Sequence, residues 1–386
     1  MKKALRYRFY PTDEQRQILA QTFGCTRYVY NWALRLRTDA FYQRGESLRY
    51  HMLSARLTQL KRQVEVAWLQ EVSSVPLQQA LRHQEKAFRN FFEKRAAYPR
   101  FKKKRNKQSA EYTTSAFKWD GVNLTLAKMK TPLGIVWSRP LGGQPSIVTV
   151  TLDSAGRYFV SLLCDVPQPK PLPVTDSAVG VDVGLNDLVT TSDGFKSDNP
   201  KHLTHSLKRL KHAQRCLSRK QRASRNREKA LHRVARIHAR IADRRQDFTH
   251  KLSTRLIREN QTIVVEDLAV KNLVRNHNLA QSISDAGWGA FLRQLEYKAT
   301  WYGRTLVTID RFYPSSKRCS DCGYVHDSMP LSIRSWVCPE CGTVHDRDIN
   351  AARNILAAGL AVTACGGDIR PAVHPCIVGN PGETGT

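Results

Sequence analysis

Two pairs of cysteines constrain the fold of this chain more than any other feature of its sequence. The pairs are Cys319 with Cys322 and Cys338 with Cys341, and fifteen residues separate them. A glycine follows each pair and allows a tight turn whose backbone amides point at the sulfurs. Four thiolates at this spacing predict a closed, tetrahedral zinc site, a structural zinc ribbon, because no position is left for water. A redox pair is the alternative, but that chemistry has no use for a second pair.

The remaining cysteines do not form a disulfide framework. The chain has nine cysteines, and the five outside the two pairs are scattered along its 386 residues. The N-terminal stretch is basic but lacks the apolar segment of a signal peptide. We therefore expect reduced thiols and a cytoplasmic protein.

The charge of the chain predicts a polyanionic partner. Lysine and arginine number 62 against 33 aspartates and glutamates, a formal net charge of +29. Nucleic acid is the favoured partner, because neutralising phosphates releases counterions and drives binding. An anionic membrane surface is the rival, but no apolar run approaches the ~18 residues of a spanning helix. No lipidation motif is present either, so we expect no membrane partner.

The densest basic segment is "YPRFKKKRNKQS", which begins at Tyr98. With Tyr98 and Phe101 interleaved, its cations suit phosphate contact combined with stacking on RNA. The alternative is a solvated charged face. The candidate RNA-binding residues are Arg100, Lys102, Lys103, Lys104, Arg105 and Lys107.

A helix before this segment carries a second candidate surface. An apolar stripe runs through Leu77, Leu81, Phe88 and Phe92. The opposite face is predicted to carry Gln79, Arg82, Lys86 and Arg89. Gln79, Arg82 and Lys86 suit contacts to purine edges next to a DNA target. A plain solvated face explains the pattern equally well.

The hydrophobic periodicity divides the chain into a first part with helices and strands and a second part of alternating type. The first part predicts a strand, a helical region, an all-β region and a proline-rich linker, over residues 3–10, 14–95, 110–165 and 165–177. The second part predicts strands over 178–184, 262–268 and 304–310, a basic helical hairpin over 201–250 broken near 223–226, and a helix over 285–302. Residues 359–386 are rich in glycine and proline and predict a loose tail.

Three acids lie where acids are unfavourable. Asp182 interrupts an apolar strand, Glu266 ends another, and Asp348 lies in the first turn of the helix after the ribbon. A salt bridge would explain Glu266 alone, and the helix dipole would explain Asp348 alone. Together they could converge on two Mg²⁺ ions ~3.5–4 Å apart, as in phosphodiester hydrolysis. Strand, hairpin, acidic strand and acidic helix is also the order of elements in an RNase H-like nuclease.

The chain resembles TnpB, the transposon-associated nuclease of the OrfB type that is related to the compact type V CRISPR effectors. The resemblance covers nearly the whole chain. It is carried by "YPRFKKKR" at 98–105, "GVDVGLNDLVTTSDG" at 180–194, "VVEDLAVKNL" at 264–273, the ribbon cysteines with their neighbours, and "HDRDINAARNIL" at 345–356. By that resemblance Asp182, Glu266 and Asp348 match the three RuvC acids, and none is replaced.

The resemblance implies a multidomain fold that combines α+β and α/β parts. It implies a β-barrel wedge domain (1–12 and 98–174), a helical recognition domain (13–97), an RNase H-like RuvC nuclease domain (175–312 and 343–358), an inserted zinc ribbon (313–342) and a flexible tail (359–386).

The resemblance also implies an RNA-guided DNA endonuclease. Its cofactors would be structural zinc, catalytic magnesium and a transposon-derived guide RNA, and its target double-stranded DNA next to a short motif. One protein chain per RNA and a location at the bacterial or archaeal nucleoid are expected. A transposition recombinase and a non-cleaving RNA- and DNA-binding regulator are the rival functions.

Overall fold

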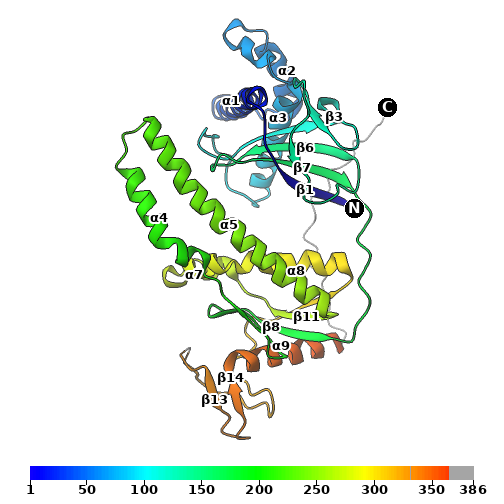
Figure 1. Cartoon of the computed structure of the whole chain (residues 1–386), viewed down its shortest axis with the longest axis vertical. Coiled ribbons are helices and arrows are strands. Elements are labelled where there is room, and N and C mark those ends of the chain that lie inside the picture. Colours follow the sequence, from blue (N-terminus) through cyan, green and yellow to red (C-terminus); the bar gives the residue numbers. More distant parts are fainter. Residues whose placement is uncertain (331, 365–386) are drawn as a thin grey trace. The chain divides into compact units, whose positions relative to one another are not determined.

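The computed structural model describes residues 1–330 and 332–364, and these form two compact units (Figure 1). The first unit comprises residues 1–167 with 221–236, and the second comprises 168–220 with the described residues from 237 onward. The mixed α/β content predicted from the sequence is confirmed. The tail predicted over 359–386 is wrong at its start, because residues 359–364 are still helical, and its residues 365–386 lie outside the described ones.

An antiparallel sheet of five strands organises the first unit. Its order is β2-β6-β7-β1-β5, with the strands β1 (Lys2–Phe9), β2 (Gln108–Thr113), β5 (Ile135–Val136), β6 (Pro145–Leu152) and β7 (Tyr158–Asp165). The N-terminal strand β1 thus pairs along its length with β7, and Lys2 lies opposite Asp165. A short hairpin of β3 (Phe117–Trp119) and β4 (Leu124–Leu126) follows the 3₁₀ turn η2 (Thr114–Ala116). The all-β region predicted from the alternation is therefore present.

Helices follow the first strand. They are α1 (Asp13–Arg44), α2 (Tyr50–Leu60), the 3₁₀ segment η1 (Val64–Gln70) and α3 (Ser74–Phe92). Thr12 caps the start of α1, because its hydroxyl accepts from the Gln15 amide while the Gln15 side chain accepts from the Thr12 amide. Gly45, at φ 66°, ends α1 in the left-handed conformation that glycine adopts without strain.

A mixed sheet of five strands organises the second unit. Its order is β10-β9-β8-β11-β12, with β8 (Ala178–Asp182), β9 (Asp187–Thr191), β10 (Lys196–Asp198), β11 (Thr262–Glu266) and β12 (Thr305–Ile309). The strands β8, β11 and β12 are parallel, whereas β9 and β10 continue β8 as an antiparallel meander. The two predicted acidic strands are thus direct neighbours.

Helices cover both faces of this sheet. Residues of α5 (Arg225–Glu259), α6 (Val270–Leu273), α7 (His277–Ala286) and α8 (Trp288–Tyr302) pack on one face and α9 (Arg347–Ala364) on the other, whereas α4 (His202–Ser218) contacts α7. Ile263 and Val265 of β11 pack with α8, whereas Val264 between them packs with Ile355 of α9, so β11 is buried on both sides (Figure 1).

The predicted basic hairpin is confirmed as α4 and α5, but the single helix predicted over 285–302 is wrong at its start. Gly287, at φ 78°, ends α7 and begins α8. A left-handed residue interrupts the helical hydrogen-bond ladder, and apolar spacing does not reveal such a break.

Two glycines let α9 lie directly on the sheet. A Cβ atom on Gly180 of β8 would collide with the carbonyl oxygen of Ala352 and lie 2.7 Å from the amide nitrogen of Leu356. A Cβ atom on Gly359 would collide with Val264 of β11. This close approach fixes the height of α9 over β8 and β11.

The segment between β12 and α9 holds the cysteine pairs and a two-stranded sheet of β13 (Ser335–Val337) and β14 (Val344–Asp346). None of the described helices has an apolar stretch long enough to cross a bilayer.

Candidate functional site

The two cysteine pairs form two matching turns. The amide of Cys319 donates to the carbonyl of Tyr324 (2.7 Å), and the amide of Gly323 donates back to the carbonyl of Cys319 (3.1 Å). In the second turn, Cys338 and Gly342 repeat the pattern, with the amide of Cys338 donating to Thr343 (2.9 Å) and that of Gly342 donating to Cys338 (2.9 Å). Gly323 and Gly342 both have positive φ, at 84° and 72°. The local sequence thus builds the same thiol-bearing turn twice.

The four sulfurs fit a tetrahedral metal. They lie within 4.8 Å of one another, and the Cys319–Cys341 and Cys322–Cys338 sulfur separations are 3.7 and 3.5 Å. A tetrahedron with Zn–S bonds of ~2.3 Å has sulfur separations of ~3.8 Å. This four-cysteine cluster therefore fits zinc, as the spacing predicts.

The sequence did not reveal that His345 lies beside this centre. Its Nε2 atom lies 3.0 Å from Cys319 Sγ, and its ring lies 4.6 Å from the ring of Trp336. The imidazole is buried, and burial lowers its pKa. A histidine seven residues after the third cysteine lies outside the Cys-x-x-Cys pattern, so spacing gave no signal for it.

Two of the predicted acids end neighbouring parallel strands. Val181 of β8 lies opposite Val265 of β11, so Asp182 and Glu266, one residue further on, reach the same edge of the sheet. The carboxyl ends of parallel strands are where α/β folds gather functional groups. Sequence alone could not give this register, because it depends on pairing across 84 residues.

The third acid belongs to the same electrostatic cluster. Asp348 is in the first turn of α9, one turn before the contact between Ala352 and Gly180. Burial, together with the charges of Glu266 and Asp348, raises the pKa of Asp182 to about 7. Burial also raises the pKa of Glu266.

The two acids at the strand ends have no ion-pair partner among the described residues. Among the residues that the structure describes, Asp182 and Glu266 form no ion pair with Lys, Arg or His, and Asp348 lies 3.4 Å from the guanidinium of Arg334. The Glu266 carboxylate accepts a hydrogen bond of 2.5 Å from the Ser315 hydroxyl. The charge of Arg347 lowers the pKa of Asp182 only in part, because that pKa is still raised. Carboxylate oxygens are the donors that Mg²⁺ prefers, so the residues present fit a divalent cation.

The neighbouring acids have structural partners instead. Asp267 forms an ion pair with Arg311. Asp346 accepts from the amides of Asp348 (3.1 Å) and Ile349 (3.0 Å) and pairs with Lys196 (2.7 Å), so it caps the N-terminus of α9.

Two buried asparagines attach the cysteine turns to α9. Asn350 donates to the carbonyl of Arg318 (2.7 Å) and accepts from the amide of Ser320 (2.9 Å). Asn354 donates to the carbonyls of Ser315 (2.8 Å) and Arg318 (2.6 Å). The helix that carries Asp348 and the first cysteine turn are therefore one hydrogen-bonded assembly.

The predicted RNA-binding loop is folded around a glutamine. The side-chain amide of Gln108 donates to the carbonyls of Lys103, Lys104 and Asn106 at 3.3, 3.0 and 2.6 Å. All six predicted cations are exposed, namely Arg100, Lys102, Lys103, Lys104, Arg105 and Lys107. Lys102 differs, because its ammonium lies 4.2 Å from the centre of the Tyr30 ring and burial lowers its pKa.

The predicted face of α3 requires a correction. Arg82 and Lys86 are exposed, but Gln79 is 9% exposed, so the three do not share one solvated face. Phe92, predicted in the apolar stripe, is 71% exposed. The other three stripe residues, Leu77, Leu81 and Phe88, are buried as predicted, whereas Phe92 is the last residue of α3.

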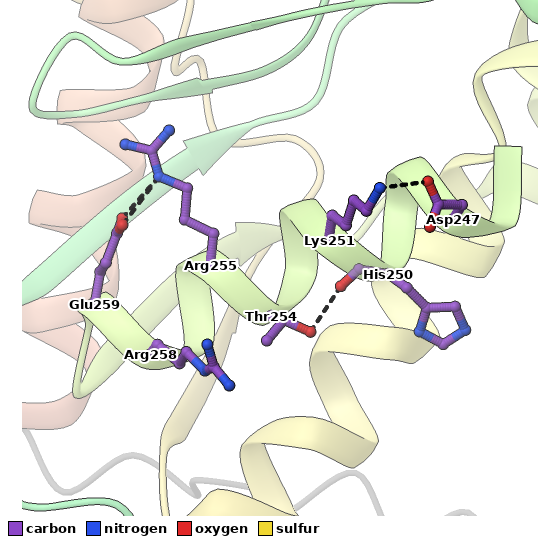
Figure 2. A pocket seen from close by; sticks show the side chains of 7 residues that line it. All are labelled: Asp247, His250, Lys251, Thr254, Arg255, Arg258 and Glu259. Carbon is purple, nitrogen blue, oxygen red and sulfur yellow. Dashed lines mark hydrogen bonds and ion pairs between the residues drawn. The ribbon is translucent and has the colours of Figure 1, made fainter. Parts of the chain in front are cut away.

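A pocket of about 450 Å³ lies on α5, and none of the three predicted acids lines it (Figure 2). Seven residues line it, and Lys251 pairs with Asp247 while Arg255 pairs with Glu259. Two of its cations are thus paired within the helix, and we do not assign a site there.

Comparison with known proteins decides the family. A relative from Streptomyces pristinaespiralis, named "Putative RNA-guided DNA endonuclease", is 58% identical over 96% of this chain and 92% of its own. The chain belongs to the TnpB family. A second TnpB-family relative, "Putative RNA-guided DNA endonuclease InsQ" from Escherichia coli K12, is 34% identical over 94% of both chains.

Family models match three segments. Residues 161–277 match "Probable transposase" (OrfB_IS605), and residues 288–355 match "Cas12f1-like, TNB domain". Residues 1–46 match "Helix-turn-helix domain", although in this TnpB-family chain they form one strand and the unbroken helix α1.

The solved structure described as "Cryo-EM structure of the Cas12f1-sgRNA-target DNA complex" is 14% identical over 92% of this chain and 99% of that chain, with a TM-score of 0.36. That score is too low to relate the two folds element by element.

Proposed function

We propose that this chain is an RNA-guided DNA endonuclease of a transposable element. It binds a transposon-derived guide RNA and cuts complementary double-stranded DNA beside a short motif. The observation that carries the proposal is the convergence of Asp182, Glu266 and Asp348 at one edge of a mixed sheet, in a chain that is 58% identical to a protein named for that activity.

The three acids act as the catalytic residues of a RuvC-like nuclease. They hold two Mg²⁺ ions, which when bound supply an activated water and neutralise charge on the leaving oxygen. Ser315 keeps the Glu266 carboxylate in one orientation through its hydrogen bond. The cap formed by Asp346 and the contact at Gly180 keep Asp348 beside the strand ends.

The remaining parts serve nucleic-acid binding. The sheet of the first unit forms the wedge domain (1–12 and 98–174), α1 to α3 form the recognition domain (13–97), and the nuclease domain (175–312 and 343–358) encloses the zinc ribbon (313–342). The exposed cations of the 98–107 loop contact the guide RNA backbone. Arg82 and Lys86 remain candidates for contacting the DNA next to the target. The complex contains one protein chain per RNA.

A cleavage assay separates this function from its rivals. The protein is purified with its bound RNA, that RNA is sequenced, and matched DNA with a randomised flank is supplied with Mg²⁺ or EDTA. Cutting that requires both RNA match and Mg²⁺, and that Asp182→Ala abolishes without loss of bound RNA, supports the proposal. Strand joining would indicate a recombinase, and binding without cutting would indicate a regulator.

A further inference from the structure

The segment between β12 and the first cysteine turn presents an aromatic ring to solvent. This segment, residues 310–315, is called the 310–315 turn below. Among the aromatic side chains that the structure describes, Phe312 is the most exposed, at 85%, ahead of Tyr42 at 78%. A single exposed apolar side chain needs no explanation by itself. Phe312 does need one, because of how its backbone is held and where it lies.

Hydrogen bonds fix the backbone on both sides of Phe312. Its amide donates to the Asp310 carboxylate (2.7 Å), and the amide of Tyr313 donates to the Asp310 carbonyl (3.2 Å). The amide of Ser315 donates to the Tyr313 carbonyl (2.8 Å), and Asn354 of α9 donates to the carbonyl of Ser315 (2.8 Å). The turn therefore holds the ring outward, so the ring does not swing freely on a loose loop.

The same turn contacts both acids at the end of β11. Ser315 donates to Glu266 (2.5 Å), and Arg311 forms an ion pair with Asp267. Ile309, which precedes the turn, lies directly opposite Glu266 in the parallel pairing of β11 and β12. Phe312 is thus three residues from the strand position that faces a proposed catalytic acid.

We propose that Phe312 is a stacking subsite for one base of the unpaired DNA strand that enters the acid cluster. This proposal rests on the proposed nuclease function and names a residue that binds the DNA substrate. An aromatic face accepts every base, which suits an enzyme whose sequence specificity comes from its RNA. A base stacked here holds the neighbouring phosphodiester close to Glu266, whose own orientation the same turn fixes.

Photocrosslinking tests this contact without any cleavage. The RNA-bound protein is mixed in EDTA with matched DNA that carries 5-iododeoxyuridine at successive positions of either strand, irradiated and analysed by peptide mass spectrometry. We expect a crosslink to Phe312 from one or two adjacent positions near the cut. Crosslinks confined to other residues at every position would overturn the proposal.

Variants at the same position separate stacking from bulk. Under single-turnover conditions with Mg²⁺, Phe312→Ala and Phe312→Leu should both slow cleavage about tenfold, whereas Phe312→Trp should stay within about threefold of the wild-type rate. Bound RNA and target affinity in EDTA should be unchanged. Leu360→Ala removes an apolar side chain that is 42% exposed near the end of α9 and serves as the control, with wild-type cleavage expected.

The outcomes keep the two proposals apart. Wild-type cleavage by Phe312→Leu would show that stacking is not required and would reject the subsite. If the wild-type complex does not cut but crosslinks at Phe312, the nuclease function fails while the base-stacking subsite stands.

Discussion

At the scale of single residues, Asp182 works against the stability of the fold that holds it. Burial and the charges of Glu266 and Asp348 raise its pKa to about 7. Without a cation, its ionised form is therefore disfavoured in the folded chain relative to the unfolded one. Buried carboxyl groups with strongly raised pKa values are concentrated at functional sites, where the acid is needed although it destabilises the fold.

Asp182→Asn should stabilise the magnesium-free protein. The folded pKa lies above the unfolded value of 3.8, so the folded state binds more protons between these values and wild-type stability falls as pH rises through that window. Asparagine does not titrate. The free energy of unfolding should rise by ~4 kcal/mol at pH 8 and by roughly half as much at pH 5.5. Denaturant titrations of both proteins measure this, and an equal gain at both pH values would contradict it.

Ser315 should set the metal requirement of the site. Ser315→Ala removes a hydrogen bond of 2.5 Å to Glu266, and a hydrogen bond to a charged group contributes about 1.5–3 kcal/mol. We expect a cleavage rate reduced about tenfold at low Mg²⁺ and a higher Mg²⁺ concentration for half-maximal rate. Ser315→Thr keeps the hydroxyl and should restore most of the loss. A Mg²⁺ dependence unchanged in Ser315→Ala would rule out this role.

At the scale of elements, the sequence predicted what lies within one segment better than how segments meet. The strands around Asp182 and Glu266 and the break between α4 and α5 followed from apolar runs and turn residues. The break at Gly287 did not, because a single left-handed residue leaves the apolar spacing intact. The close contact of α9 with β8 depends on Gly180, and glycine within a strand predicts only that some backbone approaches.

Gly180→Ala should therefore displace α9. Its new methyl group would collide with the carbonyl of Ala352, and neither backbone can yield without moving the helix that carries Asp348. We expect a loss of ~3 kcal/mol in the unfolding of the second unit, with cleavage lost as well. Gly289→Ala in α8 is the matched control, because its methyl group would meet neighbours only at 3.5 Å or more. Equal stability of the two variants, measured by calorimetry, would show that the contact at Gly180 is not needed.

At the scale of the whole molecule, a net charge of +29 predicts a polyanion but not where it binds. The four cysteine ligands could be predicted, since two closely spaced Cys-x-x-Cys pairs fit one tetrahedral site, but the contact with His345 could not. The sequence could not predict which individual cations are free to contact phosphate, because that depends on neighbours distant in sequence. Lys102 shows this: it lies in the middle of the basic run, yet its ammonium is placed against Tyr30 of α1.

The salt dependence of RNA binding should reveal which cations of the 98–107 loop contact phosphate. Each phosphate contact on a single strand contributes ~0.7 to the slope of log affinity against log salt. Changing Lys103, Lys104 and Arg105 together to alanine should reduce that slope by about 2, because all three are exposed. Lys102→Ala is the control within the same loop. It should leave the slope nearly unchanged, because its ammonium is engaged with Tyr30. Filter-binding titrations of the guide RNA from low to high salt give both slopes, and a larger change for Lys102→Ala than for the triple variant would place the RNA on the opposite side of the loop.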